Sequence, residues 1–200
     1  GGAGSGTVAY AITSGSDVAD LAENGTLTFK KSGTVEVKAT KAEDETYAEA
    51  TATQTINVGK ATVTVTATAK AIKVGATVPS LASPVKDTDY TVTGLVGSDE
   101  LTMVTMKYQK DASDVTPAAV GEYDIVVEAT ADADKYTVNA VNAKLTISEK
   151  TEQTGFAFTS SATATYGQPL QLEAIGGAGS GTVAYAITSG SDVADLAENG

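Results

Sequence analysis

The chain has 200 residues, with 25 acidic residues against 13 lysines and no arginine, so its formal net charge is −12. It contains no cysteine, histidine or tryptophan. These absences exclude Ser-His and Cys-His nucleophile pairs and the usual thiolate or imidazole metal sites, and the negative charge disfavours nucleic acid and anionic lipid as partners.

The first 25 residues, Gly1–Gly25, return letter for letter as Gly176–Gly200. Because residue 176 repeats residue 1, the chain spans one period of 175 residues and the start of the next. Self-similarity at a fixed period is typical of repeat architectures, in which each copy adds the same structural unit. The sequence therefore predicts one slice of a tandem array.

Strand patterns follow along the chain, and helix patterns are scarce. Asn24-Gly25 is a strong hairpin signal between two apolar stretches. Apolar and polar residues alternate, as in half-buried strands, over residues 27–29, 34–39, 122–127 and 143–147. Short strands bounded by Gly, Pro, Asn and Asp predict an all-β fold of immunoglobulin-like sandwiches arranged end to end, with a β-grasp-like fold as the minor alternative for the middle module.

Two similar final hairpins divide the chain into modules. Each has a strand ending in Ala-Thr, an acidic loop, and a tyrosine (Tyr47 or Tyr136) before a last strand. We place the boundaries near Lys60 and Lys150. Residues 60–150 then form one complete module, residues 1–59 the C-terminal part of an Ig-like module without its opening strands, and residues 151–200 the N-terminal part of the next without its closing strands.

The split modules would expose unpaired strand edges. We therefore expect either that the natural chain continues past both ends, which we favour, or that neighbouring chains complete each other by strand exchange. Exchange has a cost, because Gly1–Gly25 and Gly176–Gly200 would compete for one location.

Two stretches resemble known families. Residues 18–28 (VADLAENGTLT) and 32–40 (SGTVEVKAT) resemble the bacterial Ig-like domains of surface adhesins. The middle module resembles the repeats named after the mucin-binding glycoproteins of Gram-positive and gut bacteria. The matching pieces are Ala61–Val65, Val74-Gly75 with Pro79, Tyr90–Val96, Val120–Ile125, Tyr136 and Leu145–Ile147.

The middle module departs from that family pattern at Val74, where the family usually has tyrosine before the glycine. A Tyr-Gly pair appears instead at Tyr166-Gly167, in the other module. The two resemblances imply an extracellular, surface-anchored stalk, and they carry no catalytic residues to transfer.

Candidate sites are few. Calcium prefers carboxylate and carbonyl oxygens, and the acidic loops offer weak calcium candidates at Asp132, Asp134, Glu43 and Asp44; we otherwise expect no cofactor, and solvated loops explain these acids better. Tyr90, Met103, Met106 and Tyr108 form a candidate ligand patch. A spontaneous bond between Lys70 or Lys73 and Asn139 or Asn142 needs burial that their polar neighbours disfavour.

The sequence favours a non-enzymatic structural stalk or spacer repeat of a bacterial cell-surface adhesin, extending a distal binding domain from the cell wall. Its expected partners are adjacent repeats of the same polypeptide, without nucleic acid or membrane insertion. One alternative is a repeat that binds host mucin, glycan or matrix protein by avidity. Another is a self-assembling surface filament with strand complementation between chains. An enzyme is the least expected class.

Overall fold

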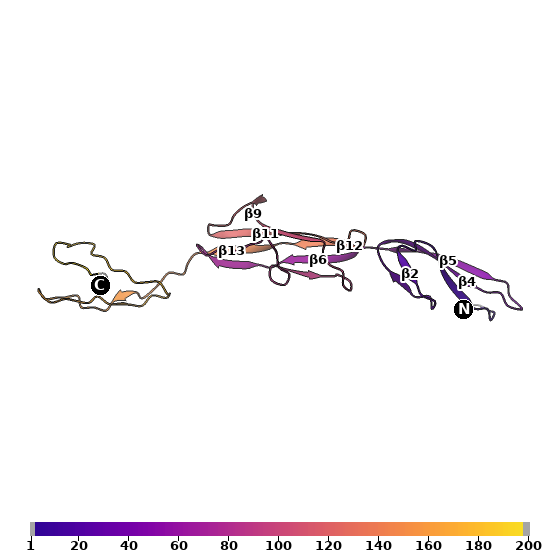
Figure 1. Ribbon diagram of the computed structural model, residues 1–200, viewed down its shortest axis with the longest axis horizontal. Coiled ribbons are helices and arrows are strands. Elements are labelled where there is room, and N and C mark those ends of the chain that lie inside the picture. The colour runs from indigo at the N-terminus through magenta and orange to yellow at the C-terminus, as the bar shows by residue number, and fades with distance from the viewer. Residues whose placement is uncertain (1–2, 198–200) are drawn as a thin grey trace. The chain divides into compact units, whose positions relative to one another are not determined.

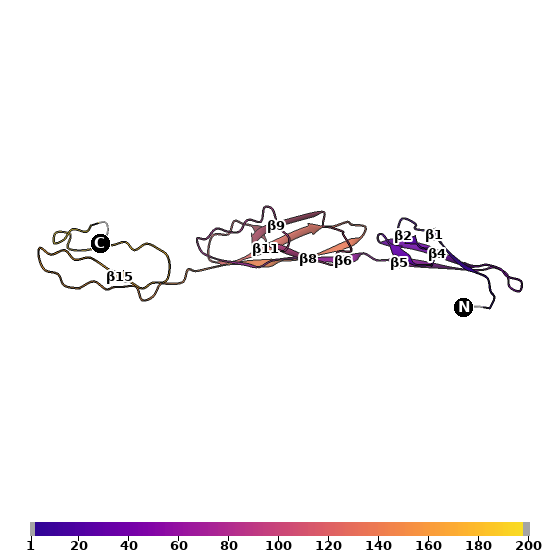
Figure 2. The same cartoon turned by 60° about the horizontal axis from the view of Figure 1, so that its bottom comes forward.

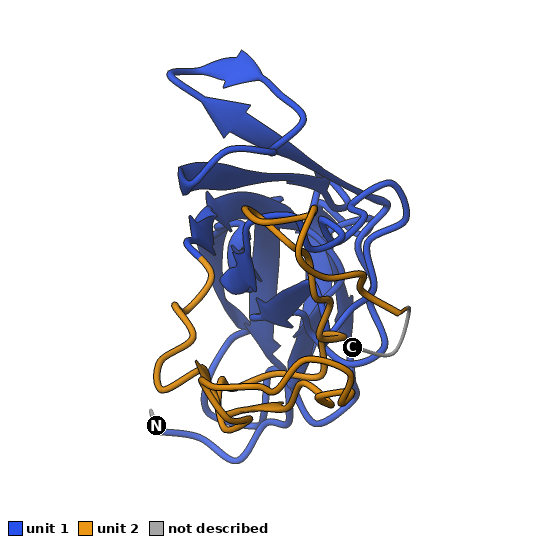
Figure 3. Ribbon diagram, turned by 90° about the vertical axis from the view of Figure 1, so that its left-hand side faces the viewer, with its two compact units in different colours: residues 1–149 blue, residues 150–200 orange. Residues whose placement is uncertain are grey.

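A computed structural model describes residues 3–197, and within them it contains strands and no helix. The prediction of an all-β fold is confirmed. No helix in the described part of the chain is long and apolar enough to cross a membrane. The chain divides into two compact units, Gly1–Glu149 and Lys150–Gly200 (Figure 3).

The first part of unit 1 contains two small antiparallel sheets. The larger has the order β1-β4-β5 and the smaller pairs β2 with β3. Their bounds are β1 Val8–Ser14, β2 Ala19–Leu21, β3 Leu27–Phe29, β4 Gly33–Lys41 and β5 Ala50–Val58. The hairpin expected at Asn24-Gly25 is present as the β2–β3 turn, where Gly25 has a φ of +86° that glycine adopts at low cost. We call Gly1–Val58 the first module.

The core of the first module lies between its two sheets. Val18, Ala19 and Val35 are buried, and Ile12, Leu27, Val37, Ile56 and Val58 pack against them. This cluster covers only one end of the β1–β4–β5 sheet. Val8 and Tyr10, at the other end of β1, are about half-exposed.

The middle module follows directly, because only Gly59 and Lys60 separate β5 from β6. A five-stranded sheet has the order β10-β9-β11-β13-β7 and a three-stranded sheet has the order β12-β6-β8. The bounds are β6 Ala61–Ala67, β7 Lys70–Lys73, β8 Tyr90–Thr93, β9 Met103–Lys110, β10 Ser113–Asp114, β11 Gly121–Thr130, β12 Tyr136–Val141 and β13 Ala143–Ser148.

The two opening strands of the middle module pair in parallel with its two closing strands. β6 pairs with β12 in parallel from Ala61↔Tyr136 to Thr66↔Val141, and β7 pairs with β13 in parallel. All other strand pairs in this module are antiparallel. Each end of the module's chain is therefore held by a parallel ladder.

The two sheets of the middle module pack into one core. Figures 1 and 2 show β9 and β11 on one side of the module and β6 on the other. The buried cluster draws on both sheets: Val65, Ala67, Leu81, Met106, Tyr108, Tyr123, Ile125, Val127, Leu145 and Ile147. Burying an aliphatic side chain of this size stabilises a fold by roughly 1.5–3 kcal/mol, so this core dominates the stability of the module.

Two polar anchors fix the chain around this core. The Tyr123 hydroxyl donates to the Ala119 carbonyl, 2.9 Å away and four residues upstream, as in the tyrosine corner of Ig-like sandwiches. Asp89 is the one charged residue that is buried in the described part of the chain. Its carboxylate accepts hydrogen bonds from the Lys70 ammonium at 2.7 Å and from the Val85 N–H at 2.9 Å, which ties β7 to the loop before β8.

Unit 2 contains little regular structure. Its strands are β14 (Ala157–Phe158) and β15 (Ala174–Ile175), which pair with each other. The copy of the repeated peptide at residues 176–197 contains no strand, and Figure 1 draws this yellow segment without arrows. The same sequence forms β1 and β2 in the first module, so its conformation depends on its surroundings.

We predict that Asp89→Asn destabilises the middle module by about 3 kcal/mol at neutral pH, because removing one member of a buried pair strands the other charge. The Lys70 ammonium, and then the Val85 N–H, hold the pKa of Asp89 below its ordinary value. The pair therefore stabilises the fold fully above the unfolded-state pKa of about 3.9, and this contribution is lost as pH falls through the lowered folded-state pKa.

Urea unfolding at pH 7 and near pH 2, followed by NMR signals of the Val65 and Leu145 amides, measures this effect. The difference in the free energy of unfolding between wild type and Asp89→Asn should be smaller at the lower pH. Lys144→Met is the matched control, because the Lys144 ion pairs with Glu122 and Asp124 are exposed and should contribute little. Equal stability of Asp89→Asn and wild type at pH 7 would contradict the prediction.

Candidate functional site

The middle module has an open groove beside β8, with a volume of about 660 Å³. Its lining comes from the loop before β8, from β8 itself, from the loop between β8 and β9, and from the start of β9. The lining residues are Pro84, Lys86, Tyr90, Val92, Leu95, Gly97, Ser98, Asp99, Glu100, Leu101, Thr102, Met103 and Val104. Carboxylates, an ammonium and a tyrosine ring in one shallow groove suit a polar ligand better than an apolar one.

Tyr136 positions the wall of this groove. Its ring is buried at the start of β12, and its hydroxyl donates to Asp99 at 2.8 Å while accepting from the Val96 N–H at 2.9 Å. The Lys135 ammonium lies 3.2 Å from both Asp99 carboxylate oxygens. The loop between β8 and β9 is thus fixed by residues at the start of a late strand of the same module.

The charges at this position stabilise one another. Hydrogen bonds from Tyr136 and then Lys135 lower the pKa of Asp99, and the Asp99 carboxylate raises the pKa of Lys135. Burial is the main reason that the pKa of Tyr136 is raised. Asp99 therefore stays ionised and occupied by its partners, which makes it a structural carboxylate and a poor general base.

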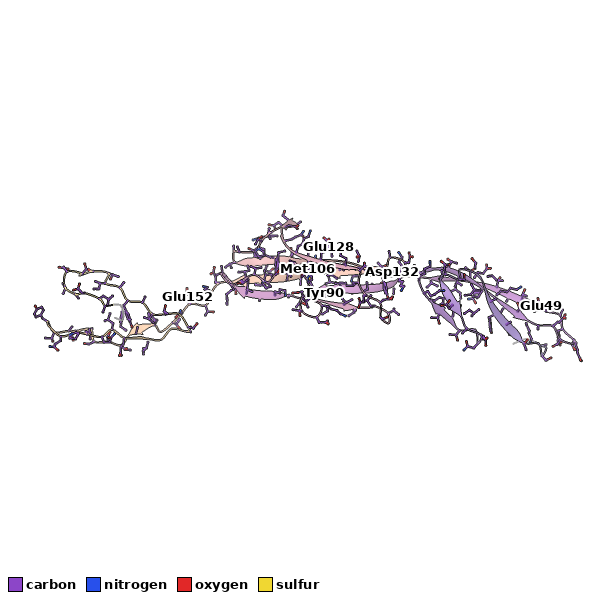
Figure 4. The ribbon with its side chains drawn as sticks, viewed as in Figure 1. Glu49, Tyr90, Met106, Glu128, Asp132 and Glu152 are labelled. Atoms are coloured by element: carbon purple, nitrogen blue, oxygen red, sulfur yellow. The ribbon has the colours of Figure 1, made fainter. Side chains whose placement is uncertain are left out.

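The four residues of the predicted ligand patch do not form one exposed surface. Met106 and Tyr108 are only 8% and 9% exposed, because alternate β9 side chains point into the core. The Tyr108 hydroxyl also donates to the Pro79 carbonyl at 2.9 Å. Tyr90 and Met103 do line the groove. Figure 4 labels Tyr90 and Met106, which come from β8 and β9.

Two of the acidic calcium candidates, Asp44 and Asp132, lie in turns, where their carboxylates accept hydrogen bonds from backbone N–H groups. Asp44 accepts from the N–H groups of Thr46, Ser5 and Tyr47, which lower its pKa to about 2. Asp132 accepts from the Asp134 N–H at 2.9 Å. Within residues 3–197, no group of three or more acidic side chains is arranged to hold a metal ion.

Two of the four residues weighed for a Lys–Asn bond, Lys70 and Asn142, have other side-chain partners. Lys70 pairs with Asp89, and the Asn142 side-chain oxygen accepts from the Val127 N–H at 3.1 Å. Asn139 lies in β12 opposite Thr64. The described contacts thus give Lys70 and Asn142 separate structural roles.

Sequence reasoning missed the residues that shape the groove. Asp99, Lys86 and Glu100 lie in loops without periodicity, so their convergence follows from tertiary contacts alone. A weak signal was present at Tyr136, because a tyrosine that begins a last strand needs a partner for its hydroxyl when buried.

We predict that Tyr136→Phe loosens the groove wall without unfolding the module. In this variant the Val96 N–H loses its acceptor, and the Asp99 carboxylate loses the hydrogen bond that the Tyr136 hydroxyl donates. The backbone amides of residues 95–102 should therefore exchange their hydrogens with solvent several-fold faster. Hydrogen exchange measured by NMR tests this. Tyr108→Phe is the control, since its hydroxyl bonds elsewhere; equal protection of residues 95–102 in both variants would refute the assignment.

Two turns of the same kind, each with glycine as its third residue, lie at Lys73–Ala76 in unit 1 and at Thr165–Gln168 in unit 2. In Lys73–Ala76 the Ala76 N–H bonds to the Lys73 carbonyl at 3.0 Å around Gly75, with φ +82°. In Thr165–Gln168 the Gln168 N–H bonds to the Thr165 carbonyl at 3.0 Å around Gly167, with φ +79°. Both turns need a positive φ at their third residue, which glycine supplies. Val74 and Tyr166 hold the same place before the glycine.

Comparison with known proteins agrees with this architecture. No curated protein matches the chain. Residues 63–146 match the family model described as MBG domain (YGX type), a range that includes most of the two sheets and all the residues that line the groove. Over these residues the middle module is similar to MBG domains, a type of repeat that occurs in bacterial surface proteins.

Proposed function

We propose that this chain is a spacer repeat of a bacterial surface adhesin, extending a distal binding domain away from the cell. The observation that carries the proposal is the exact return of 25 residues after a period of 175, in a chain built from β modules. Identical copies in series set a length, and their stabilities add nearly independently. The MBG match supports an extracellular location at the bacterial surface.

Short connections favour a spacer over a loose tether. Only Gly59 and Lys60 lie between the last strand of the first module and β6. Within unit 1, the Ser32 N–H donates to the Asp134 carbonyl at 2.8 Å, and the Ser32 hydroxyl donates to the same oxygen. A two-residue link with a hydrogen bond beside it leaves little bending freedom.

Charge supports the same function. The net charge of −12 makes neighbouring copies repel one another, which opposes collapse and keeps a long array soluble. The proposal includes no enzymatic activity and no cofactor, and its partners are adjacent repeats of the same polypeptide.

We predict that reach grows linearly with the number of periods. A ten-residue strand is about 33 Å long, so a module with its link spans roughly 35–45 Å and a period adds about 70–90 Å. Small-angle X-ray scattering on chains of one, two and three periods measures the maximum dimension. A matched series with ten Gly/Ser residues inserted between Gly59 and Lys60 should be less extended per residue. A maximum dimension that stays constant with added periods would overturn the proposal.

The groove supports a second candidate function, in which each copy binds a host glycan, mucin or matrix protein weakly and the array gains affinity by number. Tyr90 and Lys86 offer a ring face and an ammonium in one 660 Å³ hollow, a combination that suits the hydroxyl groups and sugar-ring faces of a glycan.

We predict for this candidate that glycan-array signal rises steeply with repeat number and falls at least tenfold in Tyr90→Ala/Lys86→Ala. Lys144→Ala is the control, since Lys144 lies outside the groove. Equal signal from chains of one and three periods would contradict a gain of affinity by avidity. If chains of every length give no signal, the binding function is refuted and the spacer function remains.

A further inference from the structure

The turn between β2 and β3 places a reactive pair, Asn24-Gly25, at the surface of the first module. Asn24 is exposed and is followed by glycine, whereas Asn57, Asn139 and Asn142 are followed by valine or alanine. Because glycine has no Cβ, its backbone nitrogen is unhindered, and this nitrogen is next in the chain to the Asn24 side-chain amide. Asparagine is a thermolabile residue, and among these four Asn24 has the neighbour that best permits the reaction.

The reaction available to this pair replaces ammonia by water. The Gly25 nitrogen loses its proton to solvent and bonds to Cγ of Asn24, and the side-chain nitrogen leaves as ammonia. Water then opens the resulting cyclic imide at either of its carbonyl carbons. Attack at Cγ gives aspartate, and attack at the main-chain carbonyl carbon gives isoaspartate, in which the backbone runs through Cγ. Water is the only other reactant, so the reaction needs neither an oxidant nor a reductant.

The closed turn holds both reacting groups in hydrogen bonds. The Gly25 N–H donates to the Ala22 carbonyl at 2.9 Å, and loss of its proton would leave a negative nitrogen facing that oxygen. The Asn24 side-chain oxygen accepts from the Thr26 N–H at 3.0 Å, which fixes the orientation of the side chain. The Ala22 N–H donates to the Thr26 carbonyl at 2.9 Å and closes the turn. Cyclisation must therefore first break the bond from Gly25.

Side chains on both sides keep the turn in this state. The Tyr10 ring of β1 lies against Gly25, so closely that a Cβ added to the glycine would be 3.0 Å from a ring carbon. Leu27 begins β3 directly after the turn and packs against the buried cluster of the first module. Gly25 itself has a φ of +86°, a conformation that an opened chain need not keep. The nucleophile is thus covered as long as β3 stays in place.

We propose that Asn24 is a site of spontaneous deamidation that is protected while the β2–β3 turn is closed and reacts when the turn opens. The rate in the folded chain is then the rate in an open chain multiplied by the fraction of time that the turn is open. Isoaspartate adds a methylene to the backbone, so the bond from Gly25 to Ala22 cannot form again in the same register. The new carboxylate also lies next to Glu23 in the chain. A transient opening becomes permanent in this way.

The modification would give each repeat a lasting record of local unfolding. The same 25 residues return after a period of 175, so a tandem array carries this pair once in every period. Because each repeat contacts only its neighbours and the stabilities of repeats add nearly independently, one copy can be modified while the others stay intact. This chemistry does not depend on the spacer function.

Peptide mapping of the full-length chain measures the reaction. Cleavage after lysine releases Gly1–Lys30, in which Asn24 is the one amide side chain, and mass spectrometry with chromatography separates its aspartate and isoaspartate forms. At one mildly alkaline pH, Asn24 should react at least tenfold faster in the guanidinium-unfolded chain than in the native chain. Equal rates in the two states would refute protection by the turn, and no reaction in the unfolded chain would refute the site.

Two variants test whether opening of the turn controls the rate. Leu27→Ala removes the anchor of β3 and should speed the reaction of the native chain several-fold. The rate in the unfolded chain should not change, because Asn24 keeps its neighbours in the sequence. Thr28→Ala is the matched control, since Thr28 lies on the same strand with its side chain exposed, and it should leave both rates as in wild type. A folded Leu27→Ala chain that reacts no faster than wild type would overturn the proposal.

Wild type alone provides a test that does not depend on how well Leu27→Ala folds. At guanidinium concentrations below the unfolding transition, the deamidation rate of Asn24 should rise in proportion to the hydrogen-exchange rate of the Gly25 amide measured by NMR. Both rates report the same opening of the turn. A deamidation rate that stays constant while Gly25 exchange accelerates would show that the closed turn reacts as well, and would refute the proposal.

Discussion

A β-strand persists only where a neighbour satisfies its backbone N–H and C=O groups, and this constraint governs the whole chain. The repeated 25 residues show it directly. Val8–Ser14 is a strand because β4 lies beside it, from Val8↔Lys41 to Ser14↔Glu36. The same letters at residues 183–189 form no strand, and among the described residues no strand equivalent to β4 pairs with them. Intrinsic propensity is identical in the two places, so pairing decides the outcome.

Side-chain burial follows from the same constraint. The middle module has both sheets, and its Val63, Val65 and Ile125 are fully buried. The first module has a three-stranded sheet and a two-stranded sheet, and its buried cluster is limited to Val18, Ala19 and Val35. Unit 2 has one short strand pair in its described residues, and most of its large apolar side chains are exposed. Apolar residues alone therefore do not make a core; they need two paired layers.

The strands were the most predictable part of this fold. Alternation placed the strands at 34–39, 122–127 and 143–147, which the structure extends to 33–41, 121–130 and 143–148. A period of two reveals a strand and its faces but not its neighbours, so the parallel pairing of β6 with β12 could not be read from the sequence. Tyr136 begins β12 as expected, whereas Tyr47 precedes β5 and is half-exposed.

The site was less predictable. The predicted ligand patch combines Met106 and Tyr108 with Tyr90 and Met103, but alternation along β9 sends Met106 and Tyr108 into the core. The buried pair of Lys70 with Asp89 joins residues 19 apart, and the Asp99 cluster joins residues 37 apart. Such contacts depend on how loops fold over a sheet. Loop residues show no hydrophobic periodicity, so the sequence does not reveal which of them meet.

The two parallel ladders of the middle module have a mechanical consequence. Tension applied through Lys60 and Glu149 pulls β6 by its start and β13 by its end, in opposite directions. The register pairs of β6 with β12 and of β7 with β13 then resist as shear, with all their hydrogen bonds strained together. A hairpin pulled from its open end would unzip one bond at a time. This strand order thus suits a module that must withstand pulling along its length.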